Sequence, residues 1–194
     1  MGTFEYVMVL VSIVIGLALA HILSSLGAAV HRLRGHGDAI RLEPVYLVWV
    51  GFVLIWLVSF WWWEFRFQAL EIEWTYGLYL FVISYSVCLF LIAVILIPDR
   101  MDGMRDSYEY FIAGRRWFFG AVLVGIGFDV ADTFIKGVEW GTRPLNLGVN
   151  GVLIVACFFG IVSKRRRVQL VTGATAFTVQ LASVFWALPS LGQK

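Results

Sequence analysis

Two carboxylates, Asp129 and Asp132, lie inside an apolar run that extends from Arg115 to Lys136. Their spacing of three residues places them on one face of a helix. An ionised carboxylate in hydrocarbon is costly unless it is paired, solvated or protonated, so their position predicts proton or cation handling. Asp132 precedes Lys136 by four residues, which predicts an ion pair near the outer rim and leaves Asp129 as the more informative acid. A static ion pair or a capped break in the helix is the structural alternative.

His21 is the histidine that lies within an apolar run. Because histidine titrates near physiological pH, it suits a proton relay, a pH gate or an ion site, although a hydrogen-bonded core residue is the alternative. His31 and His36 lie outside the apolar runs, so no second histidine offers an axial ligand within the membrane for a b-type haem. A Cys/His cluster for structural zinc is also missing from the sequence, so we expect no cofactor and no metal.

Further polar side chains interrupt the other apolar runs. We expect them to turn inward, where they can hydrogen-bond with one another or line a wet cavity. Tyr85, Asn150 and Gln180 therefore join His21, Asp129 and Asp132 as candidates for an ion or solute pathway. The hydroxyl groups among them can instead bond their own helix backbone. The remaining polar positions in these runs are Ser84, Ser86, Thr172, Thr175 and Thr178.

The elements that must position these residues are six apolar runs. The chain has 194 residues, of which 60% are hydrophobic and 14% are charged, and this composition is too apolar for a soluble domain. Each run has the length that a helix needs to cross roughly 30 Å of hydrocarbon, which predicts a single all-α integral membrane domain over residues 1–194. The predicted helices are about 7–30, 45–63, 77–97, 117–135, 147–163 and 168–188.

Two further segments have more than one interpretation. The connection 99–116 mixes acids and bases with aromatic residues, and it fits an interfacial half-helix or an ordered loop about equally well. Trp61, Trp62 and Trp63 end the second apolar run, and they predict an anchor at the membrane interface or, alternatively, a contact between protomers.

The distribution of basic residues predicts the orientation. Connections one, three and five hold eleven Lys and Arg residues, whereas the opposite side holds four. By the positive-inside rule, both termini should face away from the cytoplasm. The net charge of +2 is too small to favour nucleic acid as a partner, so the lipid bilayer is the partner that the composition predicts.

A weak internal similarity suggests two copies of three helices, residues 1–98 and 99–194. With three helices in each copy, the second copy would be inserted upside down, as in many transporters. The alternative is chance, because Gly, Ala and Pro are common in membrane helices. The matches pair Ile15-Gly16 with Ile126-Gly127, Ala20-His21 with Ala131-Asp132, and Pro44, Leu47 and Gly51 with Pro144, Leu147 and Gly151.

Two motifs carry a resemblance to a known family. The segment from Phe4 to Ile13, FEYVMVLVSI, with Gly16-Leu17 after it, and the segment 115–120, RRWFFG, resemble a family of small uncharacterised bacterial six-helix integral membrane proteins. The resemblance covers the whole chain. It implies a bacterial inner membrane and no catalytic residues.

The first hypothesis is a small, homo-oligomeric channel or transporter for protons, cations or a small solute. The second is a non-transporting accessory or scaffold subunit whose polar groups hold helices together. A lipid-processing membrane enzyme is third, and no nucleophile elbow, phosphate loop or metalloprotease helix supports it. A wet cavity that touches both His21 and Asp129 favours transport, whereas a dry core with locally paired groups favours a scaffold.

Overall fold

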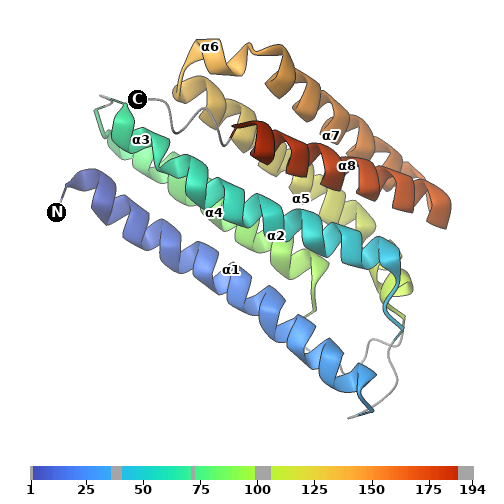
Figure 1. Ribbon diagram of the computed structural model, residues 1–194. Coiled ribbons are helices and arrows are strands. Elements are labelled where there is room, and N and C mark those ends of the chain that lie inside the picture. The colour runs from blue at the N-terminus through green and yellow to red at the C-terminus, as the bar shows by residue number, and fades with distance from the viewer. Residues whose placement is uncertain (1, 36–40, 71–72, 99–105, 188–194) are drawn as a thin grey trace.

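The fold is a bundle of helices, seen in a computed structural model that describes residues 2–35, 41–70, 73–98 and 106–187 (Figure 1). Within these ranges there is no strand, and the β-type pairing is one isolated bridge between Arg41 and Asp106. The helices are α1 (Thr3–Leu33), α2 (Pro44–Glu64), α3 (Arg66–Ala69), α4 (Tyr76–Leu96), α5 (Ser107–Ile135), α6 (Val138–Gly141), α7 (Pro144–Val162) and α8 (Arg166–Ala187).

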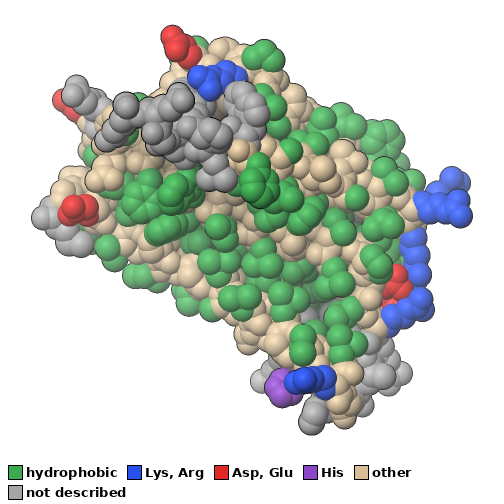
Figure 2. Space-filling model, in the orientation of Figure 1, with side chains coloured by type: hydrophobic (Ala, Val, Ile, Leu, Met, Phe, Trp, Pro, Cys, Tyr) green, Lys and Arg blue, Asp and Glu red, His purple; other side chains and the backbone are tan. Residues whose placement is uncertain are grey.

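Six of these helices, all except the one-turn α3 and α6, are long and apolar enough to cross a membrane. This confirms the six predicted apolar helices. Figure 2 shows hydrophobic side chains over the middle of one face, while the charged side chains lie towards its two ends. Such a distribution is what a bilayer requires of a multi-pass helical protein.

The helix ends follow local sequence signals. Pro44 and Pro144 occupy the first turn of α2 and α7, where the missing N–H costs nothing. The Thr75 side chain accepts a hydrogen bond from the backbone N–H of Leu78 at the start of α4. These three starts lie within a few residues of the predicted boundaries.

The start of α5 differs from the predicted one. The prediction began this helix at residue 117, but residues 107–116 already belong to it. The described part of the connection 99–116 is therefore neither a loop nor a separate half-helix. Asp106 caps the helix by accepting from the backbone N–H groups of Tyr108 and Glu109. Phe111 is 2% exposed, so the first turns of α5 are fixed by burial of an aromatic ring as well as by the cap.

Helix α2 lies at the centre of the bundle and packs against α1, α4, α5 and α8. Over its most apolar window 56% of the residues are buried, compared with 22% for α7 and α8, so these two helices lie at the periphery of the bundle. Neighbours also include α1 with α4, α4 with α5, α5 with α7 and α7 with α8. The structure therefore places α2, α4, α5, α7 and α8 around one shared interior, with α1 outside it against α2 and α4.

One half of the interior is filled by aromatic rings. The Trp49 ring lies 5.0 Å from Phe119 and 5.4 Å from Phe118, centroid to centroid, in edge-to-face geometry. Phe52 and Phe111 complete this cluster. The backbone of α7 approaches the Phe119 ring closely at Gly160, where a Cβ atom would overlap the ring. We call this end of the bundle, from the aromatic cluster to the C-terminal end of α7, the packed half.

The C-terminal end of α7 is tied to its neighbours through its carbonyl groups. Arg115, which is 7% exposed, donates to Ile161 O at 3.2 Å, and Tyr108 donates to Lys164 O at 2.7 Å. The side-chain amide of Gln169 donates to Gly160 O at 2.8 Å. These side chains satisfy carbonyls that the end of a helix leaves without partners.

The predicted inverted repeat would equate α1, α2 and α4 with α5, α7 and α8. It then requires α5 to pack along α8 in the way that α1 packs along α4. The main partners of α5 are instead α4 and α7. The repeat of residues 1–98 and 99–194 stays a prediction that this packing does not show.

Candidate functional site

The other half of the interior is hollow, and we call it the cavity half. Its cavity has a volume of about 110 Å³, and Leu145 in its wall is 36% exposed. One water needs roughly 10–15 Å³ of such space, so the cavity holds several waters or a small solute. The lining comes from five long helices and α3: Trp56, Ser59, Phe60, Trp63, Glu64, Arg66, Tyr85, Asp129, Asp132, Thr133, Lys136, Leu145, Asn146, Val149, Asn150, Leu153, Gln180 and Ser183.

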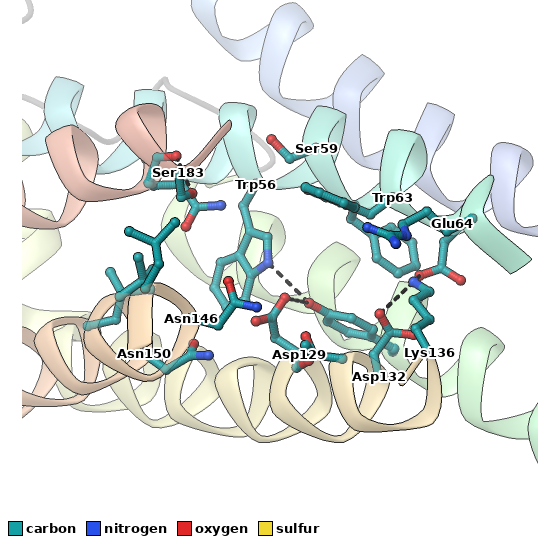
Figure 3. A pocket seen from close by; sticks show the side chains of 18 residues that line it. Trp56, Ser59, Trp63, Glu64, Asp129, Asp132, Lys136, Asn146, Asn150 and Ser183 are labelled. Atoms are coloured by element: carbon teal, nitrogen blue, oxygen red, sulfur yellow. Dashed lines mark hydrogen bonds and ion pairs between the residues drawn. The ribbon is translucent and has the colours of Figure 1, made fainter. Parts of the chain in front are cut away.

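Five of the six predicted pathway residues meet at this cavity. They are Tyr85 of α4, Asp129 and Asp132 of α5, Asn150 of α7 and Gln180 of α8. Asp129 and Asp132 lie one turn apart near the end of α5, so both carboxylates face the same space (Figure 3). Their predicted proximity is therefore confirmed, whereas their use as a pathway is a separate matter that geometry alone does not decide.

Asp129 is held by uncharged neighbours. The Tyr85 hydroxyl donates to Asp129 Oδ1 at 3.1 Å and accepts from Trp56 Nε1 at 3.2 Å, which makes a chain of hydrogen bonds across three helices (Figure 3). From α7, Asn150 lies within hydrogen-bonding reach of the same carboxylate. Within the described part of the chain, no basic side chain forms an ion pair with Asp129. The site therefore offers one carboxylate that still lacks a positive partner.

Tyr85 is fixed by its ring as well as by its hydroxyl. It is 1% exposed and stacks on Phe128 at 5.5 Å, and its ring lies 4.6 Å from that of Phe60. A ring with this little freedom presents its hydroxyl to Asp129 in one orientation. The donor is thus preorganised, and the carboxylate does not have to order it.

Asp132 belongs to a buried cluster of three charges. Lys136 Nζ lies 2.5 Å from Asp132 Oδ2 and 2.9 Å from Glu64 Oε1, and it sits 4.5 Å from the centroid of the Phe67 ring. This confirms the predicted i,i+4 pair. The Asp132 and Lys136 side chains are only 9% and 6% exposed beside Phe67 of α3, so the pair is buried, and its position near the outer rim of the membrane stays a prediction.

The acceptors in this cluster outnumber the donors. Glu64 Oε2 and Asp132 Oδ1 are both buried without a hydrogen-bond partner among the described residues. Both residues border the cavity, but these two oxygens are themselves buried away from it. A buried acceptor without a donor is costly, so these two oxygens lower the stability of the cluster.

His21 lies away from the cavity. Its Nε2 is 3.0 Å from the carbonyl oxygen of Ile97, the residue directly after α4, and His21 is not among the cavity-lining residues. The described residues therefore form no single cavity that touches both His21 and Asp129. The predicted grouping of His21 with the acids required α1 to face the shared interior, but α1 packs outside it against α2 and α4.

The hydroxyl residues divide between inside and outside. Ser86 and Thr172 are buried and donate to carbonyls of their own helices, at Ile83 O and Val168 O. For these two residues the alternative interpretation holds, in which a hydroxyl group bonds to the backbone of its own helix. The inward orientation expected for three other residues is wrong, because these are exposed on the bundle surface: Ser84, Thr175 and Thr178.

The three consecutive tryptophans point in three directions. Trp61 donates from Nε1 to Ser12 Oγ of α1 at 2.9 Å, and Trp62 is 49% exposed. Trp63 lines the cavity, and the Arg66 guanidinium lies 5.6 Å from the centroid of its ring. The exposure of Trp62 fits the interface anchor, which stays a prediction, while Trp63 belongs to the cavity wall.

Sequence reasoning did not foresee two members of the site. Glu64 looked like the polar end of a helix and Trp56 like an ordinary apolar residue, since neither has a motif around it. The available signal for Glu64 was its charge directly after nineteen residues of apolar sequence, on the side of the membrane where Lys136 also lies. Pairing the two required knowledge that α2 and α5 meet.

Comparisons of the chain with protein-family models, curated proteins and solved structures find no match. The site must therefore be judged by its own chemistry. In the described part of the chain, no three His, Cys, Asp or Glu side chains are grouped closely enough to hold a metal ion. What the arrangement provides is an anionic, partly aromatic chamber that can bind a positively charged group.

Proposed function

We propose that the protein is a multi-pass membrane carrier that moves protons or small cations through the site at Asp129. The single observation that carries this proposal is a half-buried carboxylate that faces a cavity and is bound by neutral donors only. Intramembrane carboxylates of this kind are costly and mark ion and substrate pathways. The carboxylate can accept a proton or a cation without breaking an existing ion pair.

The proposed direction of entry follows from charge. The cavity lies at the end of the bundle that carries α3 and α6, and the connections at that end hold few basic residues. The positive-inside rule makes this the non-cytoplasmic side. Following the family resemblance, the proposed location is a bacterial inner membrane. Association into a homo-oligomer stays part of the proposal.

A carrier suits this bundle better than an open channel. The packed half closes the interior with the cluster of Trp49, Phe118 and Phe119, so a wet path that begins at the cavity stops there. Passage to the other side requires the helices to move. Alternating exposure of one central site is the way in which carriers meet this requirement.

Flux measurements on reconstituted protein test the proposal. Liposomes carrying the wild-type protein should show proton or cation flux above empty liposomes between pH 5 and 8, and Asp129→Asn should remove at least nine-tenths of it. Glu139→Gln is a matched control, because Glu139 is exposed on α6 at the same end of the bundle and does not line the cavity. Wild-type flux equal to that of empty liposomes would contradict the carrier.

A non-transporting accessory subunit is the second candidate, and two observations favour it. His21 is bonded locally to the end of α4, and Lys136 is bound by the two carboxylates nearest to it in the cluster. Both arrangements hold helices together without moving anything. An accessory subunit predicts that Asp129→Asn lowers stability or assembly while no flux is found in the wild type.

A further inference from the structure

We infer that the natural ligand of the cavity is a small organic primary ammonium compound rather than a bare proton or a metal ion. The inference rests on the proposed function, in which Asp129 binds a cation. It adds the chemical class of that cation. Three properties of the cavity carry it: the balance of charge, the oxygen acceptors of the wall and the apolar part of the wall.

The charge of the lining leaves room for one positive group. Three carboxylates, Glu64, Asp129 and Asp132, face two basic side chains, Lys136 and Arg66. Lys136 is engaged by Glu64 and Asp132, and Arg66 lies over the Trp63 ring. Asp129 is therefore the carboxylate that an incoming cation can neutralise.

The acceptors call for N–H donors. An ammonium group carries three N–H bonds and no acceptor, and it can donate to several oxygens at once. The cavity wall offers such oxygens in the Asp129 carboxylate and in the side-chain amides of Asn150 and Gln180. A quaternary ammonium compound has the same charge but no N–H group, so it can donate to none of these oxygens.

The protein already binds one ammonium group in this way. Lys136 Nζ lies between two carboxylates and 4.5 Å from the centroid of the Phe67 ring. Asp129 offers a further carboxylate beside the same cavity.

The rest of the wall fits a carbon skeleton. Phe60, Leu145, Val149 and Leu153 are apolar and line the cavity opposite the charged cluster or beside it. A bare metal ion gains nothing from these apolar side chains, whereas a carbon skeleton is stabilised by packing against them. The volume of about 110 Å³ admits a molecule of several non-hydrogen atoms.

Calorimetric titration of the full chain in lipid nanodiscs tests the inference, with n-butylammonium chloride as the probe and empty nanodiscs as the blank. Ionic strength is held constant with NaCl. We expect saturable binding of n-butylammonium, no saturable binding of the isosteric neutral n-butanol, and at least tenfold weaker binding of tetramethylammonium. Equal binding of tetramethylammonium and n-butylammonium, or no saturable binding of n-butylammonium, would overturn the inference.

Two variants locate the binding. Asp129→Asn should weaken n-butylammonium binding at least tenfold, while Glu139→Gln should bind as the wild type does. If Asp129→Asn is not recovered folded, Leu145→Trp provides the second variant, because it fills part of the cavity from its exposed rim and keeps every carboxylate. Unchanged binding in the folded variant would place the ligand elsewhere and overturn the inference.

The outcomes separate this inference from the carrier itself. Proton flux that depends on Asp129, without n-butylammonium binding, keeps the carrier and rejects the ammonium ligand. Binding of n-butylammonium that depends on Asp129, without any flux, keeps the ligand and rejects the carrier.

Discussion

The two halves of the interior use the same helices in opposite ways. In the packed half, glycine and aromatic side chains bring α2, α5 and α7 together until Gly160 touches the Phe119 ring. In the cavity half, the same helices carry Asp129, Asn150 and Glu64 and leave about 110 Å³ between them. The comparison suggests that close packing of small and aromatic residues at one end of the bundle stabilises the fold. This stability offsets the cost of the buried charged groups at the other end.

The largest effect is expected in the cavity half. Lys136→Met leaves Glu64 and Asp132 buried without a positive partner, and breaking a buried ion pair in this way costs about 3–5 kcal/mol. Equilibrium unfolding in mixed detergent micelles measures the loss. Arg167→Met, at an exposed position of α8, is the control and should change stability by less than about 0.5 kcal/mol. A loss below about 1 kcal/mol in Lys136→Met would mean that the cluster is solvated rather than buried.

A smaller effect is expected in the packed half. Gly160→Ala puts a methyl group into the space of the Phe119 ring, and overpacking of this kind costs about 1–3 kcal/mol. Gly148→Ala on the same helix meets no neighbouring atom, so it should be neutral or stabilise the helix by up to about 1 kcal/mol. The same unfolding experiment compares the pair. Equal stability of the two variants would show that the packed half is not closely packed around α7.

The smallest effect tests where the cavity half ends. His21→Leu removes the hydrogen bond with Ile97 O, which is worth about 1 kcal/mol. It should leave flux and n-butylammonium binding unchanged, because His21 does not line the cavity. Flux assays in liposomes and the calorimetric titration measure both. A loss of flux as large as that of Asp129→Asn would join His21 to the pathway and remove the boundary between the two halves.

The sequence was sufficient for features that depend on neighbours along one helix. Six apolar runs gave six helices, and the spacing of Asp132 and Lys136 gave their ion pair. Tyr85, Asn150 and Gln180 were identified because polar groups in apolar helices turn towards an interior. Each of these conclusions needs only the period of the helix and the cost of a polar group in lipid.

Features that depend on which helices meet were beyond the sequence. Glu64 joins Lys136 across 72 residues of chain, and Arg115 is buried against α7 although its charge suggested a membrane surface. His21 was grouped with the acids because it is a polar residue within an apolar helix. The sequence does not say which helices that face of α1 contacts. Thr175 and Thr178 recur with a helical spacing on α8, but that face is the exposed one. Periodicity defines a face without saying what covers it.

The ties at the C-terminal end of α7 have a mechanical consequence. Arg115, Tyr108 and Gln169 bind the carbonyls there, whereas the N-terminal half of α7 borders the cavity and reaches α5 through Asn150 and Asp129. A helix that is bound at one end and rotates as a rigid body moves least at that end and most at the other. We therefore expect the displacement of α7 to be greatest beside Asn146 and Asn150, where a small rotation of the helix widens or narrows the space next to Asp129.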